Sequence, residues 1–117
     1  MTYVYVDGSG NRFAIAPDRL AYTPVRPEHS STGMYSGGDP ADVALTAAQL
    51  AGIEELIRAY LADTAHHIAD RVKGSGLLAH GQQQTLADMA SPARAALEEG
   101  LRALLPPGCQ PILRPRQ

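Results

Sequence analysis

The sequence predicts one α+β domain over residues 1–117, in which a small N-terminal antiparallel sheet packs against one long amphipathic helix and one or two shorter C-terminal helices. Three observations support this prediction. Two segments of alternating side chains flank a turn that contains two glycines. Residues 46–73 carry apolar side chains at the three- and four-residue spacing of a helix. A second such pattern begins at Ser91 and ends at Pro106.

The small sheet begins as a hairpin. Residues 2–6 and 12–16 alternate as strands do, and residues 7–11 join them as a turn. Residues 19–25 are a candidate third strand, in which Pro24 lies at an edge or past the end because it has no N–H to donate. A lone hairpin is marginal in water, so this third strand or a partner chain has to complete the sheet. The side chains expected to face the long helix are Val4, Val6, Phe13 and Ile15.

Residues 26–40 form a long loop rich in Gly, Ser and Pro. Loops of this length in small domains are usually functional or disordered. At the end of the loop, Asp39 and Pro40 resemble the start of a helix, whereas residues 43–45 also fit a short strand that leads into the long helix. Both interpretations remain open from the sequence.

The long helix is predicted over residues 46–73. Thr46 and Gln49 have the spacing of a capping box, and Gly74 suits the position after a helix end. Gly52 costs roughly 1 kcal/mol relative to Ala, which close packing against another element would justify. Such a helix is about 40 Å long, whereas a domain of this size is roughly 26–28 Å across. It therefore overhangs, kinks or packs against a second copy, and we favour self-association. The expected buried stripe comprises Leu50, Ile53, Ile57, Tyr60, Leu61, Thr64, Ile68 and Val72.

The C-terminal part contains shorter elements. Residues 77–79 form a short apolar strand or turn, residues 82–89 are predicted to be a helix, and residues 110–113 fit a final edge strand. Residues 114–117 are expected to form a frayed tail.

Ser91 and Pro92 open the clearer C-terminal helix, which Pro106 ends. Glu98 and Arg102 are spaced as an i,i+4 ion pair on that helix. Its predicted buried stripe comprises Ala96, Leu97, Leu101, Leu104 and Leu105.

Composition narrows the classes of partner. The net charge is −2 and no basic patch is evident, so nucleic acid is not an expected partner. No apolar run reaches the ~18 residues needed to span a bilayer, and no signal peptide is visible, so no membrane association is expected. Cys109 has no second cysteine for an internal disulfide, which fits a reducing cytoplasm. The excess of Arg over Lys, with abundant Ala, Gly and Pro, is typical of a bacterial genome rich in G and C.

Two adjacent histidines invite a metal or catalytic interpretation. Asp63 precedes His67 by four residues, and His66 precedes Asp70 by four. On a regular helix, however, adjacent side chains point about 100° apart and cannot share one ion. The sequence therefore favours a solvated His66 and a boundary His67 hydrogen-bonded to Asp63, and predicts no metal site.

The long loop is the other candidate site. Its small residues free backbone N–H groups for a ligand or another chain, and loops carry function more often than regular elements do. The alternative is a plain connector whose bulky residues plug the core. The residues that would contribute to a ligand-binding or interface site are His29, Tyr35, Ser36, Gly37, Gly38, Asp39 and His67.

One further glycine-rich segment invites a phosphate-binding interpretation. Lys73, Gly74, Ser75 and Gly76 look like a phosphate cradle, but they would follow a helix, whose C-terminal dipole has the wrong sign for an anion. We interpret them as a helix stop.

The sequence thus predicts a small bacterial, cytoplasmic protein that acts by self-association or by binding a protein partner. The alternative is a small-molecule-binding protein or small enzyme whose pocket is formed by residues 32–39. A third option is metal binding through His66 or His67. No catalytic residue and no cofactor is predicted, and a binding role is favoured over an enzymatic one.

Overall fold

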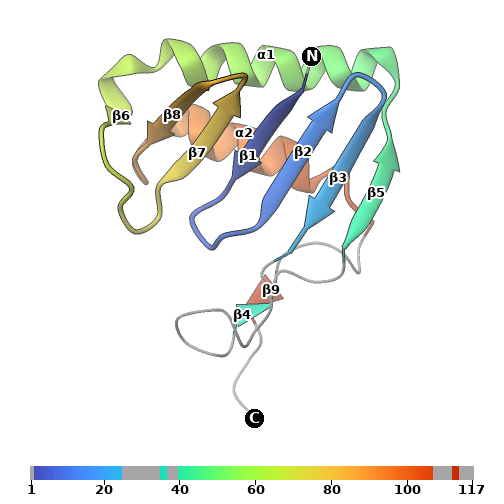
Figure 1. The fold of residues 1–117 in the computed structure, drawn as a ribbon, viewed down its shortest axis with the longest axis horizontal. Coiled ribbons are helices and arrows are strands. Elements are labelled where there is room, and N and C mark those ends of the chain that lie inside the picture. The colour runs from blue at the N-terminus through green and yellow to red at the C-terminus, as the bar shows by residue number, and fades with distance from the viewer. Residues whose placement is uncertain (1, 25–34, 37–39, 107–111, 114–117) are drawn as a thin grey trace.

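A seven-stranded antiparallel sheet dominates the computed structural model, with two helices packed on the same face of the sheet (Figure 1). The structure describes residues 2–24, 35–36, 40–106 and 112–113. The strand order is β5-β3-β2-β1-β7-β8-β6, so the first strand of the chain is the central one. The predicted small sheet of two or three strands is therefore wrong, although the α+β class holds. The strands of this sheet are β1 (Tyr3–Val6), β2 (Arg12–Ala16), β3 (Arg19–Thr23), β5 (Ala41–Ala44), β6 (His67–Ile68), β7 (Gly76–His80) and β8 (Gln83–Ala87).

The predicted hairpin is present as β1 and β2, and β3 is the predicted third strand. The Asp7 carboxylate organises the hairpin turn by accepting hydrogen bonds from the backbone N–H groups of Ser9 and Asn11, each at 2.9 Å. Gly10 adopts a φ of 97°, which other residues rarely do. The strand interpretation of the segment before the long helix is also right, since β5 pairs with β3.

The long helix is much shorter than predicted. α1 covers Ala47–Ala62, and the capping box between Thr46 and Gln49 is present at its start. The chain then makes a 3-10 turn (Thr64–His66) and enters β6, where Ile68 pairs with Leu86 of β8. A helix of 16 residues is about 24 Å long. It fits within the domain, so the overhang that suggested self-association through this helix does not exist.

Long-range contacts account for the early end of α1. The Asp63 carboxylate accepts a 2.6 Å hydrogen bond from the Ser91 hydroxyl at the start of α2. The His67 imidazole lies 2.8 Å from the carbonyl oxygen of Tyr60, in the last turn of the helix. Pairing of β6 with β8 adds backbone hydrogen bonds that a longer helix would forgo. The contact with Ser91 and the pairing with β8 join residues that are distant in sequence.

The segment predicted as a helix over residues 82–89 is also a strand. β8 pairs with β7 along its whole length, and Gly81, with a φ of 62°, occupies the turn between them. A glycine at the first of two turn residues is the signature of a type II′ hairpin. Cross-strand pairing with an apolar neighbour therefore overrides the weak helical pattern of this polar segment.

The second helix agrees with its prediction. α2 covers Pro92–Arg102, and the Ser91 hydroxyl caps it by accepting from the N–H of Arg94 at 3.1 Å. The predicted edge strand near the C-terminus is β9 (Ile112–Leu113), which pairs with β4 (Tyr35–Ser36) in a separate two-stranded ladder. The core lies between the helices and one face of the sheet. Its fully buried members include Tyr5, Phe13, Ile15, Leu20, Tyr22, Ile57, Tyr60, Leu78, Leu97 and Leu101.

The face of β1 that meets the helices is the opposite of the predicted one. Tyr5 is fully buried against the helices, whereas Val4 and Val6 lie on the other face and are only half-buried. Phe13 and Ile15 do point into the core, as predicted. Side chains alternate along a strand, so choosing Tyr5 for the core sends both valines outward.

Within the described ranges, no helix is both long enough and apolar enough to cross a bilayer.

Candidate functional site

The structure tests little of the predicted loop site. Four of its residues lie outside the described residues: His29, Gly37, Gly38 and Asp39. Tyr35 and Ser36 form β4, in which Tyr35 pairs with Leu113 and Ser36 with Ile112. The pocket expected from residues 32–39 therefore stays a prediction.

His67 belongs to β6 at one edge of the sheet. Its Nε2 lies 2.8 Å from the Tyr60 carbonyl oxygen, and its ring centroid lies 6.1 Å from that of Tyr60. A carbonyl oxygen only accepts, so Nε2 carries the proton. The predicted hydrogen bond from His67 to Asp63 is wrong, because Asp63 binds Ser91 instead.

His66 is half-buried rather than solvated, and its Nδ1 lies 3.1 Å from an Asp88 carboxylate oxygen. It therefore sits against the segment that precedes α2, not on the exposed side of a helix. Among the described side chains, no group of three or more His, Cys, Asp and Glu is placed to hold a metal ion.

A cluster of charged side chains at the junction of β1 and α2 is the most elaborate polar arrangement in the described core. Glu98 is only 6% exposed and lies at its centre. One carboxylate oxygen accepts from the Tyr5 hydroxyl at 2.5 Å and from Arg94 at 2.7 Å. The other accepts from Arg102 at 2.9 Å, which confirms the predicted i,i+4 pair. A buried carboxylate requires such donors, and this one has three.

The neighbours of Glu98 hold fixed protonation states. Burial, reinforced by the charge of Glu98, raises the pKa of Tyr5 far above its ordinary value of 10.0, so the hydroxyl stays protonated. Burial lowers the pKa of Arg94, but its hydrogen bond to Glu98 and the charge of Glu98 outweigh this, and the net shift is upward. Arg94 also donates to the backbone carbonyl oxygens of Asp88 and Met89 at 3.0 Å. The cluster thus anchors the start of α2 to the sheet.

Asp7 extends the cluster toward the hairpin turn. It is 2% exposed, and its Oδ2 accepts from the Asn11 amide at 2.9 Å while lying 4.0 Å from Arg102. Asp7 has the same inward orientation as Tyr5, two residues earlier on the alternating strand. The Arg71 guanidinium donates to the Asp7 carbonyl oxygen at 2.8 Å, which fastens the loop before β7 to the turn.

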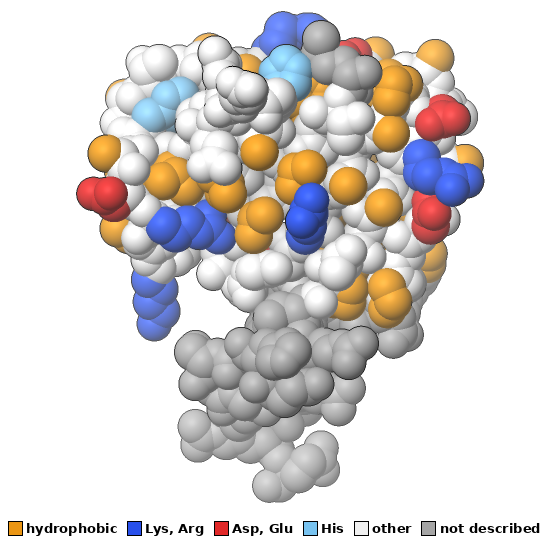
Figure 2. Space-filling view, in the orientation of Figure 1, with side chains coloured by type: hydrophobic (Ala, Val, Ile, Leu, Met, Phe, Trp, Pro, Cys, Tyr) orange, Lys and Arg blue, Asp and Glu red, His pale blue; other side chains and the backbone are white. Residues whose placement is uncertain are grey.

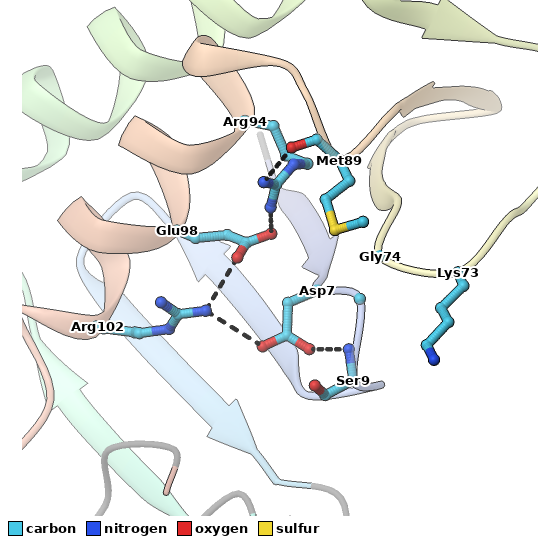
Figure 3. A pocket seen from close by; sticks show the side chains of 9 residues that line it. Asp7, Ser9, Lys73, Gly74, Met89, Arg94, Glu98 and Arg102 are labelled. Atoms are coloured by element: carbon cyan, nitrogen blue, oxygen red, sulfur yellow. Dashed lines mark hydrogen bonds and ion pairs between the residues drawn. The ribbon is translucent and has the colours of Figure 1, made fainter. Parts of the chain in front are cut away.

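A hollow of about 310 Å³ opens beside this cluster (Figure 3). Residues 7–9 of the hairpin turn, residues 73–74 before β7, Met89 and the side chains of α2 line it. Figure 3 shows Arg102 and Lys73 on opposite sides of Asp7. Its volume lies at the lower end of the range for small-ligand sites.

The carboxylates of Asp7 and Glu98 each accept several hydrogen bonds within the cluster. The raised pKa of Tyr5 keeps its hydroxyl from acting as a base near neutral pH.

Sequence reasoning identified only one contact of this cluster. Arg94, Glu98 and Arg102 follow one another at four-residue intervals, a signal that we used only for the second pair. Asp7 was interpreted as a turn residue, and its carboxylate does accept hydrogen bonds from the turn as well as lying near Arg102. Its approach to Arg102 depends on the packing of α2 across β1, and no local pattern reports that packing.

The second candidate site is the sheet face opposite the helices, which we call the open face. Along the strands, its residues alternate with the buried ones, and the cross-strand registers place them in rows. One row contains Ile68, Leu86, Leu77, Val6 and Arg12. The next contains Gln84, Ala79, Val4, Ala14 and Ala21.

The open face is apolar over its centre. Figure 2 views the molecule from the side on which α2 passes behind the sheet, and apolar side chains gather there with few charges among them. The apolar members of both rows are half-buried in the part of the chain that the structure describes. Arg12 is exposed, and Arg19 is paired with Asp42 at 3.1 Å near one edge.

Comparison with known proteins identifies no relative: no family model, no curated protein and no solved structure matches this chain.

Proposed function

We propose that this protein acts by self-association, and that two copies bind each other through the open face. The observation that carries this proposal is the group of apolar side chains on the outward positions of β1, β2, β7 and β8, which no described element covers. The interface expected from the sequence, the apolar stripe of α1, is not available, because Ile53, Ile57 and Tyr60 are buried against the sheet.

The composition of the open face supports an interface. An antiparallel sheet with one face in water normally carries polar side chains there. The outward positions of the central strand β1 and its neighbour β7 instead hold Val4, Val6, Leu77 and Ala79. Contiguous apolar surfaces of this kind usually mark a binding site.

The dimensions of the open face are sufficient for a dimer. With seven strands at about 4.8 Å spacing and about five residues per strand, the face measures roughly 30 by 17 Å. Two such faces would bury on the order of 1,000 Å² in total, near the lower limit for a specific interface. Stacked sheets of this type pack with their strands within about 30° of each other.

The partner that we propose is a second copy of the chain. β1 is the central strand, with β2 and β3 on one side and β7 and β8 on the other. A twofold axis along β1 would bring each row of one copy onto the same row of the other, so that Val4 and Val6 of the two copies meet at the axis and Ala14 of one copy faces Ala79 of the other. A twofold interface uses the same patch on both copies.

The test is the oligomeric state, measured by sedimentation equilibrium from about 1 to 500 μM, a range that brackets micromolar affinities. We expect a dimer for the wild-type protein and a monomer for Ala14→Glu, which places a charge at the centre of the interface. Ala51→Glu is the matched control, since Ala51 is exposed on α1. A wild-type monomer throughout the range, or a dimer that survives Ala14→Glu, would overturn the proposal.

We further propose a cytoplasmic location, which the lone Cys109 supports because it has no intramolecular disulfide partner.

A further inference from the structure

We infer that the hollow between the hairpin turn, the loop before β7 and α2 binds a small anion that carries a carboxylate or phosphate group. This site uses different residues from the open face. The inference therefore stands independently of the proposed dimer.

Charge is the first argument. The ionisable side chains that line the hollow are Asp7, Glu98, Lys73, Arg94 and Arg102. The two arginines balance the two carboxylates, through the contacts of Arg94 and Arg102 with Glu98 and the approach of Arg102 to Asp7. Lys73 is left as a surplus cation, and the hollow carries a net positive charge.

The second argument is unused donor capacity. Among the described residues, the Lys73 ammonium has neither an ion pair nor a hydrogen bond. The contacts of Arg102 with Glu98 and Asp7 use Nη2, and no described residue accepts from Nη1. Nε also has no partner among the described residues, but it is buried and closed to a ligand. An anion offers acceptors to the Lys73 ammonium and to Nη1 of Arg102, and the planar guanidinium suits carboxylate and phosphate oxygens.

The walls of the hollow are held in place by close contacts. A Cβ added to Gly8 would lie 2.8 Å from the Gly74 Cα, so the two loops touch through their backbones. Gly74 has a φ of 79° and packs under Met89, a residue that is 64% exposed. A wall of this rigidity with an adaptable thioether at its rim suits a ligand with a small apolar part.

The interpretation of residues 73–76 as a helix stop is wrong, because no helix precedes them directly. That interpretation rested on a helix reaching Lys73, whose C-terminal dipole would repel an anion. α1 ends at Ala62, so no helix terminus points at these residues.

The experiment is a titration of ¹⁵N-labelled protein with inorganic phosphate, and separately with succinate, at constant ionic strength. We expect saturable shifts of the backbone amides of Ser9, Gly74 and Met89. Phosphate or succinate binding alone would identify which anion the hollow accepts, and either result supports the inference.

Lys73→Gln is the decisive variant, because Lys73 is exposed and its loss should leave the fold intact. We expect it to weaken binding about tenfold or more, the effect of one lost charge-assisted contact, and Lys73→Arg to restore it. Arg58→Gln, which removes an exposed cation on α1, is the control and should change nothing. Shifts that do not saturate, or that Lys73→Gln and Arg58→Gln weaken equally, would show non-specific ion binding and overturn the inference.

Discussion

The Tyr5 hydroxyl donates a 2.5 Å hydrogen bond to the Glu98 carboxylate, although 93 residues separate the two in sequence. Tyr5 lies on the central strand and Glu98 on α2, so this bond joins the middle of the sheet to the helix that covers it. Both side chains are buried, and the two arginines that flank Glu98 share its charge. The position of α2 therefore depends on a polar contact that lies inside an apolar core.

Removing the Tyr5 hydroxyl should destabilise the protein. For Tyr5→Phe we expect the free energy of unfolding to fall by about 1–3 kcal/mol, because a buried carboxylate loses one donor. Urea denaturation followed by circular dichroism measures it. The control is Glu55→Gln, which breaks an exposed pair with Arg58 and should cost no more than about 0.5 kcal/mol. Equal effects for the two variants would refute the structural role of Tyr5.

Alkaline pH should unfold the protein through its buried tyrosines. Burial raises the pKa of Tyr60 to about 12 and raises that of Tyr5 further. A tyrosine whose folded pKa is raised contributes stability that is complete below pH ~10, the unfolded pKa, and lost as pH rises through the folded pKa. The free energy of unfolding should therefore decline above pH ~10 by up to about 1.4 kcal/mol per pH unit for each such tyrosine.

Absorbance of tyrosinate at 295 nm measures this directly. In the folded protein, Tyr5 and Tyr60 should ionise only together with the loss of tertiary structure, whereas in urea all tyrosines should titrate near pH 10. Smooth titration of every tyrosine near pH 10 without unfolding would contradict the burial of these two hydroxyls.

Ser91 should contribute twice to stability. Its hydroxyl caps α2 by accepting from the Arg94 N–H, and it donates to the Asp63 carboxylate at the end of α1. We expect Ser91→Ala to lower the free energy of unfolding by about 1–3 kcal/mol, as loss of a cap and of a charged hydrogen bond does. A double-mutant cycle with Asp63→Asn should give a coupling of at least about 0.5 kcal/mol. Additive effects would mean that the two helix ends are not linked through this bond.

Two glycines should respond oppositely to alanine. A Cβ at Gly76 would lie 2.1 Å from the Tyr5 hydroxyl oxygen, so Gly76→Ala should destabilise the protein by about 1–3 kcal/mol through overpacking. Gly52 has nothing within 4 Å of such a Cβ, so the close packing expected for it is absent. Gly52→Ala should stabilise the protein by roughly 0.5–1 kcal/mol through helix propensity. The melting temperature of Gly76→Ala should lie below that of the wild-type protein, and the melting temperature of Gly52→Ala should lie above it.

Several elements follow directly from local signals in the sequence. Thr46 with Gln49 marks the start of α1, and Ser91 with the following proline marks the start of α2. The turn at Asp7 and Gly10 produces the hairpin. These signals are reliable because each involves groups within a few residues of one another, whose geometry hardly depends on the rest of the chain.

Local signals fail where distant partners compete. Residues 67–68 and 83–87 carry patterns that suit a helix, yet they form β6 and β8 because the neighbouring strand offers backbone hydrogen bonds and packing. The outward orientation of Val4 and Val6 has the same origin. A strand with apolar side chains on both faces does not itself specify which face is buried, and the tyrosine fits the helices.

The sequence by itself determined that the protein is α+β, where its two main helices begin, and that its first strands form a hairpin. Only the tertiary structure decided where α1 ends, how large the sheet is, which face of it stays open, and that Asp7, Tyr5 and Glu98 meet Arg94 and Arg102. The physical reason is the distance in sequence between the residues that interact. Caps and turns are made by neighbours in the chain, whereas strand pairing and buried ion contacts join residues whose separation no local pattern encodes.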